Sequence, residues 1–209
     1  MNENHLDINH YDVHSRHFAL NCGGLTVGYF RVVLPKDELT NTEVLEIGKK
    51  YKLLDEEDYF HKNGKAPFPF LSYEGVPQSH WDYFNEIQSR NEMVAESSRL
   101  MLHTEHRSIR KSKLLCECAM MLYPLIFISK KNVLISVRKE HAPCYIRQGF
   151  VPIANGETYY IKETDIVGIT LTIPLSQTLS DSTIPARLHQ NINQMAEEFK
   201  TTGKIEREI

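Results

Sequence analysis

Apolar residues are spaced along the chain in two different ways, which predict strands in some places and helices in others. Runs rich in β-branched and aromatic residues are typical of strands, whereas apolar residues at three- and four-residue intervals are typical of helices. The expected strands cover residues 17–20, 25–34, 93–102, 132–137, 157–162 and 166–175. The expected helices begin near residues 42 and 81, cover 109–128 and 140–148, and start again at about 184. A turn signal at 21–24 joins the first two strands, which therefore form an antiparallel hairpin.

The order of these elements predicts a single α/β domain of the α+β type over residues 1–209. Helices alternate with strands in its central half, so we expect a mixed, mostly antiparallel sheet flanked by helices. Residues 35–90 form an insertion between two strands, partly helical and partly a glycine- and proline-rich loop over 61–79. Loops this long in a compact domain usually serve function or motion.

The overall charge gives no reason to expect nucleic acid as a partner, because the formal net charge is −3 over 209 residues. An anionic partner must then meet a local basic patch. Hydrophobic residues make up 41% and charged residues 24%, which argues against disorder. The longest apolar run, near 120–128, is about half the length of a bilayer span, so we expect no stable membrane insertion. The polar N-terminus is unlike a signal peptide, and four cysteines without a paired CxxC framework favour reduced thiols in the cytoplasm.

The first motif that carries chemistry is the sequence Tyr-Ile-Arg-Gln-Gly-Phe at 145–150, after a predicted strand and a short helix. It resembles the signature of the GNAT acyltransferase superfamily, in which a helix ends in Tyr-x-x-x-Gly-Phe before the next strand. Gly149 allows a left-handed helix cap, and Phe150 anchors the following strand in the core. The resemblance implies that the Tyr145 hydroxyl protonates the leaving thiolate of the acyl carrier. The alternative is that Tyr145 only packs on an amphipathic helix.

The second motif is Ala-Glu-Ser-Ser-Arg at 95–99, in the predicted strand 93–102. It resembles the Glu-x-Ser-Arg strand of acyl-homoserine-lactone synthases and long-chain N-acyl amino acid synthases. The resemblance implies that Glu96 accepts a proton from the attacking amine or orients it, and that Arg99 pairs with Glu96 or with an acceptor carboxylate. GNAT folds splay open at this strand, and a bulge there places a backbone N–H to hold the thioester oxygen. The alternative is a structural ion pair at the sheet edge.

The third motif is the acidic run Asp-Ile-Asn-His-Tyr-Asp at 7–12, before the predicted hairpin. It is similar to the Glu-x-Asp-x-Tyr-Asp run of the same families, with Asp7 in place of Glu and Asn9 in place of Asp. Asp12 matches in type and place. Arg31, in Val-Gly-Tyr-Phe-Arg on the second strand, resembles the buried arginine that partners these acids. The alternative for Asp7 is a solvated charge.

The fourth motif is the basic stretch at 106–113, between a predicted strand and helix. Acetyl-coenzyme A enzymes of the superfamily carry a glycine-rich loop here, whose N–H groups cradle a pyrophosphate. Arg107 aligns with that loop, but Arg110 and Ser112 replace its small residues, and Lys111 and Lys113 add charge. This turn suits a single phosphopantetheine phosphate and the acidic surface of an acyl carrier protein. The alternative is a solvated basic face.

Together these motifs resemble long-chain N-acyl amino acid synthases, acyl-homoserine-lactone synthases and PEP-CTERM/exosortase-associated acyltransferases, from about residue 7 to residue 153. The resemblance implies a bacterial enzyme with a GNAT-like sheet splayed at its centre. It implies acyl transfer from a carrier-protein or coenzyme A thioester to an amino-acid-like amine, with no tightly bound cofactor. The acyl pocket is expected between the strands at 93–102 and 133–137, lined by Leu100, Leu102, Leu134 and Phe150. The histidines are not seated as a metal site, so no metal is expected.

Two other functions stay open beside this one. A non-catalytic module with the same fold would bind an acyl carrier or lipid without turnover. An acyl-homoserine-lactone synthase is disfavoured by Asn9 and by the long insertion at 35–90, so an N-acyl amino acid synthase fits best. Family members also carry a further N-terminal segment that helps to close the acyl pocket. We expect this chain either to be shortened at its start or to form its pocket differently.

Overall fold

The backbone forms one mixed sheet, described by a computed structural model over residues 8–37, 39–54, 66–126, 131–162, 164–175 and 184–206. Its strands are β1 (Ser15–Cys22), β2 (Leu25–Val33), β3 (Met93–Leu102), β4 (Lys131–Arg138), β5 (Val151–Pro152), β6 (Thr158–Ile161) and β7 (Ile166–Leu175). The order across the sheet is β1-β2-β3-β4-β7-β5, and β6 also pairs with β7. The β3–β4 pair is parallel, and the other pairs are antiparallel.

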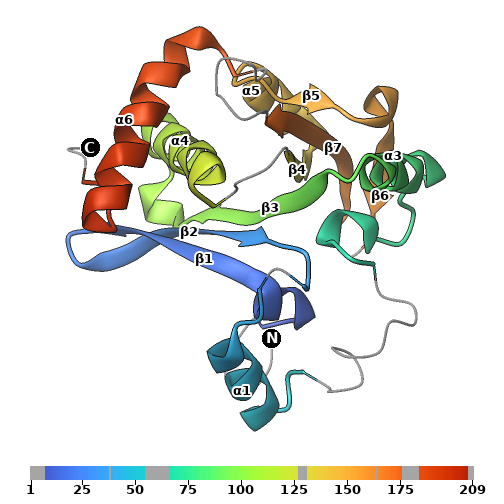
Figure 1. Ribbon diagram of the computed structural model, residues 1–209, viewed down its shortest axis with the longest axis horizontal. Helices are drawn as coiled ribbons and strands as arrows, with labels where there is room; N and C mark the ends of the chain where they lie inside the picture. Colours follow the sequence, from blue (N-terminus) through green and yellow to red (C-terminus); the bar gives the residue numbers. More distant parts are fainter. Residues whose placement is uncertain are drawn as a thin grey trace.

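Helices cover both faces of this sheet (Figure 1). They are α1 (Thr42–Lys50), α3 (Gln78–Ser89), α4 (Ile109–Ile126), α5 (Ala142–Ile146) and α6 (Ala186–Thr202). Short 3-10 turns lie at His10–His14, Pro69–Leu71, Thr104–His106, Lys139–His141 and Ala154–Gly156. Helices α4 and α6 pack together over one face, and α3 with the turn at Pro69–Leu71 lies on the other (Figure 1).

The sheet is buried on both faces because successive side chains on a strand point to opposite sides. On β2, Val32 belongs to the core beneath α4 and α6, whereas Val33 belongs to the core beneath α3. On β4, Val133 likewise belongs to the core beneath α4 and α6, and Leu134 belongs to the core beneath α3. Phe68, Phe70, Leu71, Phe84 and Ile87 supply most of the apolar surface of the second core. The insertion therefore provides the cover for one whole face of the sheet.

Strands β3 and β4 separate part of the way along their length. They pair from Met93 with Lys131 to Glu96 with Leu134, although β3 continues to Leu102 and β4 to Arg138. A bulge lies in β3 just beyond this point, because Arg31 of β2 pairs with Ser98 whereas Tyr29 pairs with Met101. The backbone of Arg99 takes up the extra residue at a φ of 54°. A bulge of this kind bends the strand and ends its pairing.

The fold class expected from the sequence is confirmed, including the central splay and the bulge in β3. The bounds of β3 are those predicted, and the first hairpin strand is longer than predicted, beginning at Ser15. The predicted helix at 140–148 is a 3-10 turn followed by the short helix α5, which has Pro143 in its first turn. Asp7, the end of the predicted helix at 127–128 and the insertion over 55–65 lie outside the described residues. No helix in the described part of the chain is long and apolar enough to cross a membrane.

We expect Gly149→Ala to destabilise the protein by about 1–3 kcal/mol, because Gly149 has a φ of 102° and a side chain strains that conformation. Gly149 follows α5, and the N–H of Phe150 donates to the carbonyl of Tyr145 at 3.2 Å across this turn. Urea unfolding of the variant measures the loss. Gly149→Asn is the matched control and should lose less, since asparagine tolerates positive φ better. Equal stability of Gly149→Ala and the unmodified protein would contradict the strain.

Candidate active site

A buried ion pair joins the N-terminal segment to the sheet. Arg31 of β2 is 3% exposed and Asp12 is 2% exposed, and Arg31 Nη1 lies 2.6 Å from Asp12 Oδ1. The same guanidinium donates to Ser98 Oγ of β3 at 2.8 Å and to Asn9 Oδ1 at 3.1 Å. Burial of a charge is costly unless it is paired and hydrogen-bonded, and Arg31 meets both conditions.

Asn9 orients Asp12, three residues further along the chain. The families whose motif the run at 7–12 resembles carry a carboxylate at the position of Asn9. Asn9 caps the turn at His10–His14: its side chain accepts from the N–H of Tyr11 at 3.1 Å. In return, the N–H of Asn9 donates to Asp12 Oδ2 at 2.8 Å, which completes a capping box. An amide suffices for this role, because the negative charge that Arg31 requires comes from Asp12.

The bulge in β3 directs Arg99 to the same aspartate. Arg99 Nη1 lies 3.6 Å from Asp12 Oδ2, and its side chain is 19% exposed. From the sequence, Arg99 was expected to pair with Glu96 or with an acceptor carboxylate. The ion pair that it does form is with Asp12, which thus holds two arginines.

Glu96 is 1% exposed and lies at the last paired position of β3 before it leaves β4. Its Oε2 accepts a hydrogen bond from the backbone N–H of Phe70, in the insertion, at 2.8 Å. Burial raises the pKa of Glu96 to about 8, although the Phe70 hydrogen bond and the charge of Arg31 oppose the rise. A carboxyl group that titrates near neutral pH is suited to accept and return a proton.

Three phenols from separate parts of the chain surround this carboxyl group, and sequence reasoning missed them. Burial raises the pKa of Tyr11 to about 12 and that of Tyr73 to about 12, and the charge of Glu96 adds to both shifts. Burial also raises the pKa of Tyr159, with a smaller contribution from Glu96. Tyr73 stacks on Tyr159 at a centroid distance of 6.1 Å. Tyr11 belongs to the acidic run at 7–12, whereas Tyr73 comes from the insertion and Tyr159 from β6, so no local motif identifies Tyr73 and Tyr159.

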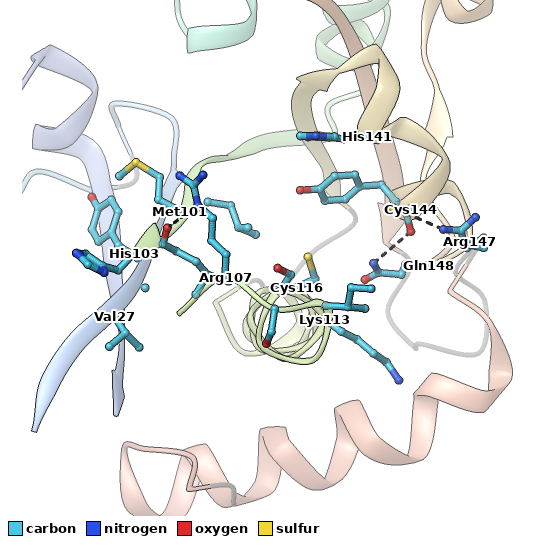
Figure 2. A pocket seen from close by; sticks show the side chains of 18 of the residues that line it. Val27, Met101, His103, Arg107, Lys113, Cys116, His141, Cys144, Arg147 and Gln148 are labelled. Atoms are coloured by element: carbon cyan, nitrogen blue, oxygen red, sulfur yellow. Dashed lines mark hydrogen bonds between the residues drawn. The ribbon is translucent and has the colours of Figure 1, made fainter. Parts of the chain in front are cut away.

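A cavity of about 1400 Å³ lies beyond the point where β3 and β4 separate. It is lined by residues from the start of β2, the end of β3, α4, α5 and the start of α6. Figure 2 shows its lining side chains. It is lined by Thr26, Val27, Gly28, Tyr29, Leu100, Met101, Leu102, His103, Arg107, Ser108, Ile109, Ser112, Lys113, Cys116, Arg138, His141, Cys144, Tyr145, Arg147, Gln148, Arg187 and Leu188. Aspartate and glutamate are absent from this set of described residues, so the cavity is strongly cationic.

Only some of the donor-binding residues expected from the sequence line the cavity. Arg107, Ser112 and Lys113 line the cavity, whereas Arg110 and Lys111 are not among its lining residues. The Nε of Arg107 donates to the carbonyl of Leu102 at 3.2 Å, which holds the turn against the end of β3.

Three further arginines line the cavity and were missed from the sequence: Arg138, Arg147 and Arg187. They come from the end of β4, the turn after α5 and the start of α6. Each is an isolated cation in its own segment, and only the tertiary structure collects them.

Two of the four residues expected to line the acyl pocket line this cavity, and two do not. Leu100 and Leu102 line the cavity. Leu134 does not, because it points to the opposite face of β4 and is fully buried in the second core. Phe150 does not either, since it is 4% exposed within the core beneath α4 and α6.

Tyr145 lines the cavity, as its expected role requires. Burial raises the pKa of its phenol well above the usual range, and the neighbouring Cys116 and Cys144 add to the shift. Its ring also packs edge-on against Phe150 at a centroid distance of 5.8 Å. Both the catalytic and the packing interpretation of Tyr145 are therefore compatible with its position.

The described residues contain no group of three or more histidine, cysteine, aspartate or glutamate side chains that would hold a metal ion.

Comparison with solved structures finds matches at low sequence identity. FeeM, an N-acyl amino acid synthase from uncultured soil microbes, is 13% identical with a TM-score of 0.50, over 77% of this chain and 72% of that chain. The CoA-dependent acyl-homoserine lactone synthase BjaI, solved with SAM and isopentyl-CoA, is 14% identical with a TM-score of 0.47, over 94% and 72%. An acyl-CoA N-acyltransferase from Pseudomonas aeruginosa is 15% identical with a TM-score of 0.42, over 76% and 67%.

The likeness to FeeM shows that this chain has the GNAT-like fold expected from its sequence. No protein-family model matches the sequence, and comparison with curated proteins finds no match.

We expect Asp12→Asn to destabilise the protein by about 3–5 kcal/mol, because it leaves the buried guanidinium of Arg31 without a counter-charge. Chemical denaturation measures the loss. Lys200→Gln, which breaks the exposed pair with Glu197, is the control and should change stability by about 0.5 kcal/mol or less. The double change Arg31→Met with Asp12→Leu should recover part of the loss. An effect of Asp12→Asn no larger than that of the control would contradict the dependence on this pair.

Glu96 should make the free energy of unfolding fall as pH rises from about 4.5 to about 8. Its folded pKa is raised, so over this window the folded state keeps a proton that the unfolded state has lost. The slope for one proton is at most about 1.4 kcal/mol per pH unit. We expect this slope in the stability difference between the unmodified protein and Glu96→Gln, measured by urea unfolding at several pH values. Glu86→Gln, at an exposed position of α3, is the control. A stability difference for Glu96→Gln that does not change with pH would refute the raised pKa.

Proposed function

We propose that this protein is an N-acyltransferase that moves a fatty acyl group from a phosphopantetheine thioester to the amine of an amino acid or similar acceptor. The observation that carries the proposal is that a cationic cavity and a buried carboxyl group both lie near the point where β3 and β4 separate. A cationic cavity lies beyond the point where β3 leaves β4, and a carboxyl group with a raised pKa lies at that point. Transfer between a bound anionic donor and an amine requires such an arrangement.

The cavity supports the donor half of the proposal. Arg107 and Lys113 on one wall, with Arg147 on the other, favour a donor that carries phosphate. Leu100 and Leu102 give the same cavity an apolar side along β3 for the start of an acyl chain. Since β4 no longer pairs with β3 beyond Glu96, the β3 edge that faces the cavity has backbone N–H groups for the thioester oxygen. Removal of one such donor costs about 10²–10³ in rate in well-studied hydrolases.

The chemistry on the acceptor side falls to Glu96 and Tyr145. Glu96 takes the proton that the amine loses as it attacks the thioester carbonyl, and a pKa of about 8 matches this task at neutral pH. Tyr145 supplies a proton to the departing thiolate, and its raised pKa keeps the phenol protonated until then. Arg31, Asp12 and Arg99 position β2 and β3 around Glu96 and do not themselves exchange protons.

An acyl carrier protein suits the donor site better than coenzyme A alone. Arg110 and Lys111 belong to the turn at the start of α4 but are not among the residues that line the cavity. Charges placed beside a cavity rather than in it serve a larger partner with an acidic surface. Ser112 and Arg110 also replace the small residues that bind a pyrophosphate closely.

One observation favours a second function, that of a module that binds an acylated carrier without turnover. Glu96 is covered by the insertion and is 1% exposed, so an acceptor amine meets the backbone of Phe70 before it meets the carboxylate. Binding without transfer is the outcome expected if that cover stays in place. An acyl-homoserine-lactone synthase is supported less, because Asn9 carries no charge.

Expression of the protein in a bacterial host, followed by mass spectrometry of lipid extracts, tests the enzyme. We expect a new N-acyl amine in cells that carry the unmodified protein. Glu96→Gln should lower its amount by about 10²-fold or more, since general-base catalysis contributes roughly 10²–10⁴. Glu86→Gln, the same change at an exposed site, should leave the amount unchanged.

Two results would sink the enzyme proposal. One is an extract of the unmodified strain without any new acyl amine, and the other is equal product in Glu96→Gln. Calorimetry with an acylated carrier protein then tests the second function. That function predicts that the unmodified protein and Glu96→Gln both bind the carrier and that neither forms product.

A further inference from the structure

Tyr29 connects the face of the sheet that carries Glu96 with the donor cavity. Residues two apart on a strand share a face, so Tyr29 lies on the same face of β2 as Arg31 and Val33. Val33 pairs directly with Glu96 of β3, which places Glu96 on this face as well. Glu96 is 1% exposed, whereas Tyr29 is half-buried and lines the cavity. A molecule in the cavity can therefore contact Tyr29 without displacing the insertion.

The hydroxyl of Tyr29 is joined to His17, an exposed histidine of β1. Tyr29 Oη lies 2.6 Å from His17 Nδ1, and His17 Nε2 lies 3.2 Å from the backbone carbonyl oxygen of Asp12. The rings of His17 and Tyr29 also stack, at a centroid distance of 6.0 Å. Because the His17 side chain is exposed, these contacts form a chain of hydrogen-bonding groups from the cavity wall to solvent.

The partners of His17 determine which of its ring nitrogens carries the proton. A carbonyl oxygen only accepts hydrogen bonds, so Nε2 carries the proton of the neutral imidazole and donates it to Asp12. Nδ1 is then an acceptor, and the Tyr29 hydroxyl donates to it. Asp12, whose carboxylate neutralises Arg31, thus also sets the tautomer of His17 through its carbonyl. In this tautomer His17 is oriented as a base towards Tyr29.

The proposed reaction has one proton more than Glu96 and Tyr145 account for. An ammonium ion has no lone pair, so the acceptor loses a first proton before it attacks the thioester and a second proton during the attack. Glu96 takes the second proton in the proposed function, and Tyr145 supplies a proton to the departing thiolate. The first proton is left over in each turnover. Since Glu96 is covered by the insertion, this proton needs a route that begins in the cavity.

We infer that Tyr29 and His17 remove the first proton from the acceptor ammonium and pass it to solvent. The ammonium gives a proton to the Tyr29 oxygen, so an N–H bond of the acceptor breaks and an O–H bond forms. The original O–H bond of Tyr29 breaks in the same step, and an N–H bond forms at His17 Nδ1. The imidazolium ion then releases its extra proton to solvent. Protons alone move, so no oxidant or reductant is needed.

The two residues have different roles in this transfer. Tyr29 contacts the acceptor and is a catalytic residue, whereas His17 acts through Tyr29. Imidazole is the side chain that exchanges protons near neutral pH, and the exposure of His17 lets it return to the neutral form after each turnover. The inference rests on the proposed function and adds the step that prepares the acceptor for attack.

Acyl transfer by the purified protein tests the inference, with a decanoyl-acyl carrier protein as donor and the standard amino acids as acceptors. Mass spectrometry measures the N-decanoyl amino acids. Tyr29→Phe and His17→Ala should each lower the rate by about 10²-fold or more, since proton transfer by a positioned side chain contributes roughly 10²–10⁴. Calorimetry should show unchanged affinity for the donor in both variants. Arg16→Gln, an exposed neighbour on β1, is the control and should keep the full rate.

Added imidazole separates proton transfer from a structural role of His17. Because His17 is exposed, imidazole from solution can occupy the space that His17→Ala leaves, and it should raise the rate of this variant about tenfold or more. It should not raise the rate of Tyr29→Phe, which lacks the hydroxyl that contacts the acceptor. Parallel reactions without protein give the uncatalysed rate to subtract. Equal responses of the two variants to imidazole would overturn the inference.

The unmodified protein and Glu96→Gln distinguish failure of this inference from failure of the proposed function. Absence of product with the unmodified protein would overturn both. Product that is lost in Glu96→Gln but formed at the full rate by Tyr29→Phe and His17→Ala would overturn the proton relay alone and leave the acyltransferase in place.

Discussion

The buried guanidinium of Arg31 is the constraint on which the site depends. A charge that is 3% exposed must be neutralised, and Asp12 does so from a segment that precedes the sheet in sequence. Because Asp12 also contacts Arg99, the pair ties the N-terminal turn to β2 and to the bulge of β3 at once. The bulge accompanies the separation of β3 from β4, and the cavity opens from that separation. Asp12, Arg31 and Arg99 thus join the segments that carry Glu96 and that lead to the cationic cavity.

The insertion gives the two faces of the sheet different roles. Its aromatic residues close the core beneath α3, and the backbone of Phe70 holds Glu96 in a dry setting. The other face is left to α4, α5 and α6, which build a cavity with arginines on both walls. A carboxyl group with a raised pKa and a cationic cavity form under opposite conditions, one dry and one wetted. Both lie along β3, at Glu96 and at Leu100 and Leu102.

Residues from distant segments supply much of the cavity chemistry. Arg138, Arg147 and Arg187 line the cavity together with Arg107 and Lys113, and Arg147 contacts Cys144 there. This collection of cations favours a ligand that carries negative charge. Tyr145 lines the same cavity.

The sequence by itself determined the order of strands and helices and the fold class, because periodicity depends on neighbours along the chain. The pairing of Asp12 with Arg31 was expected only from the family resemblance, and the structure contains this ion pair. The sequence also placed Glu96, Tyr145 and Arg107 on the right elements. Only the tertiary structure decided that Leu134 faces away from the cavity, since a strand's alternation fixes relative sides but not which side is which. Tyr73, Tyr159 and the arginines of α5 and α6 were equally hidden from the sequence. Their shared environment arises from packing between segments that no local pattern connects.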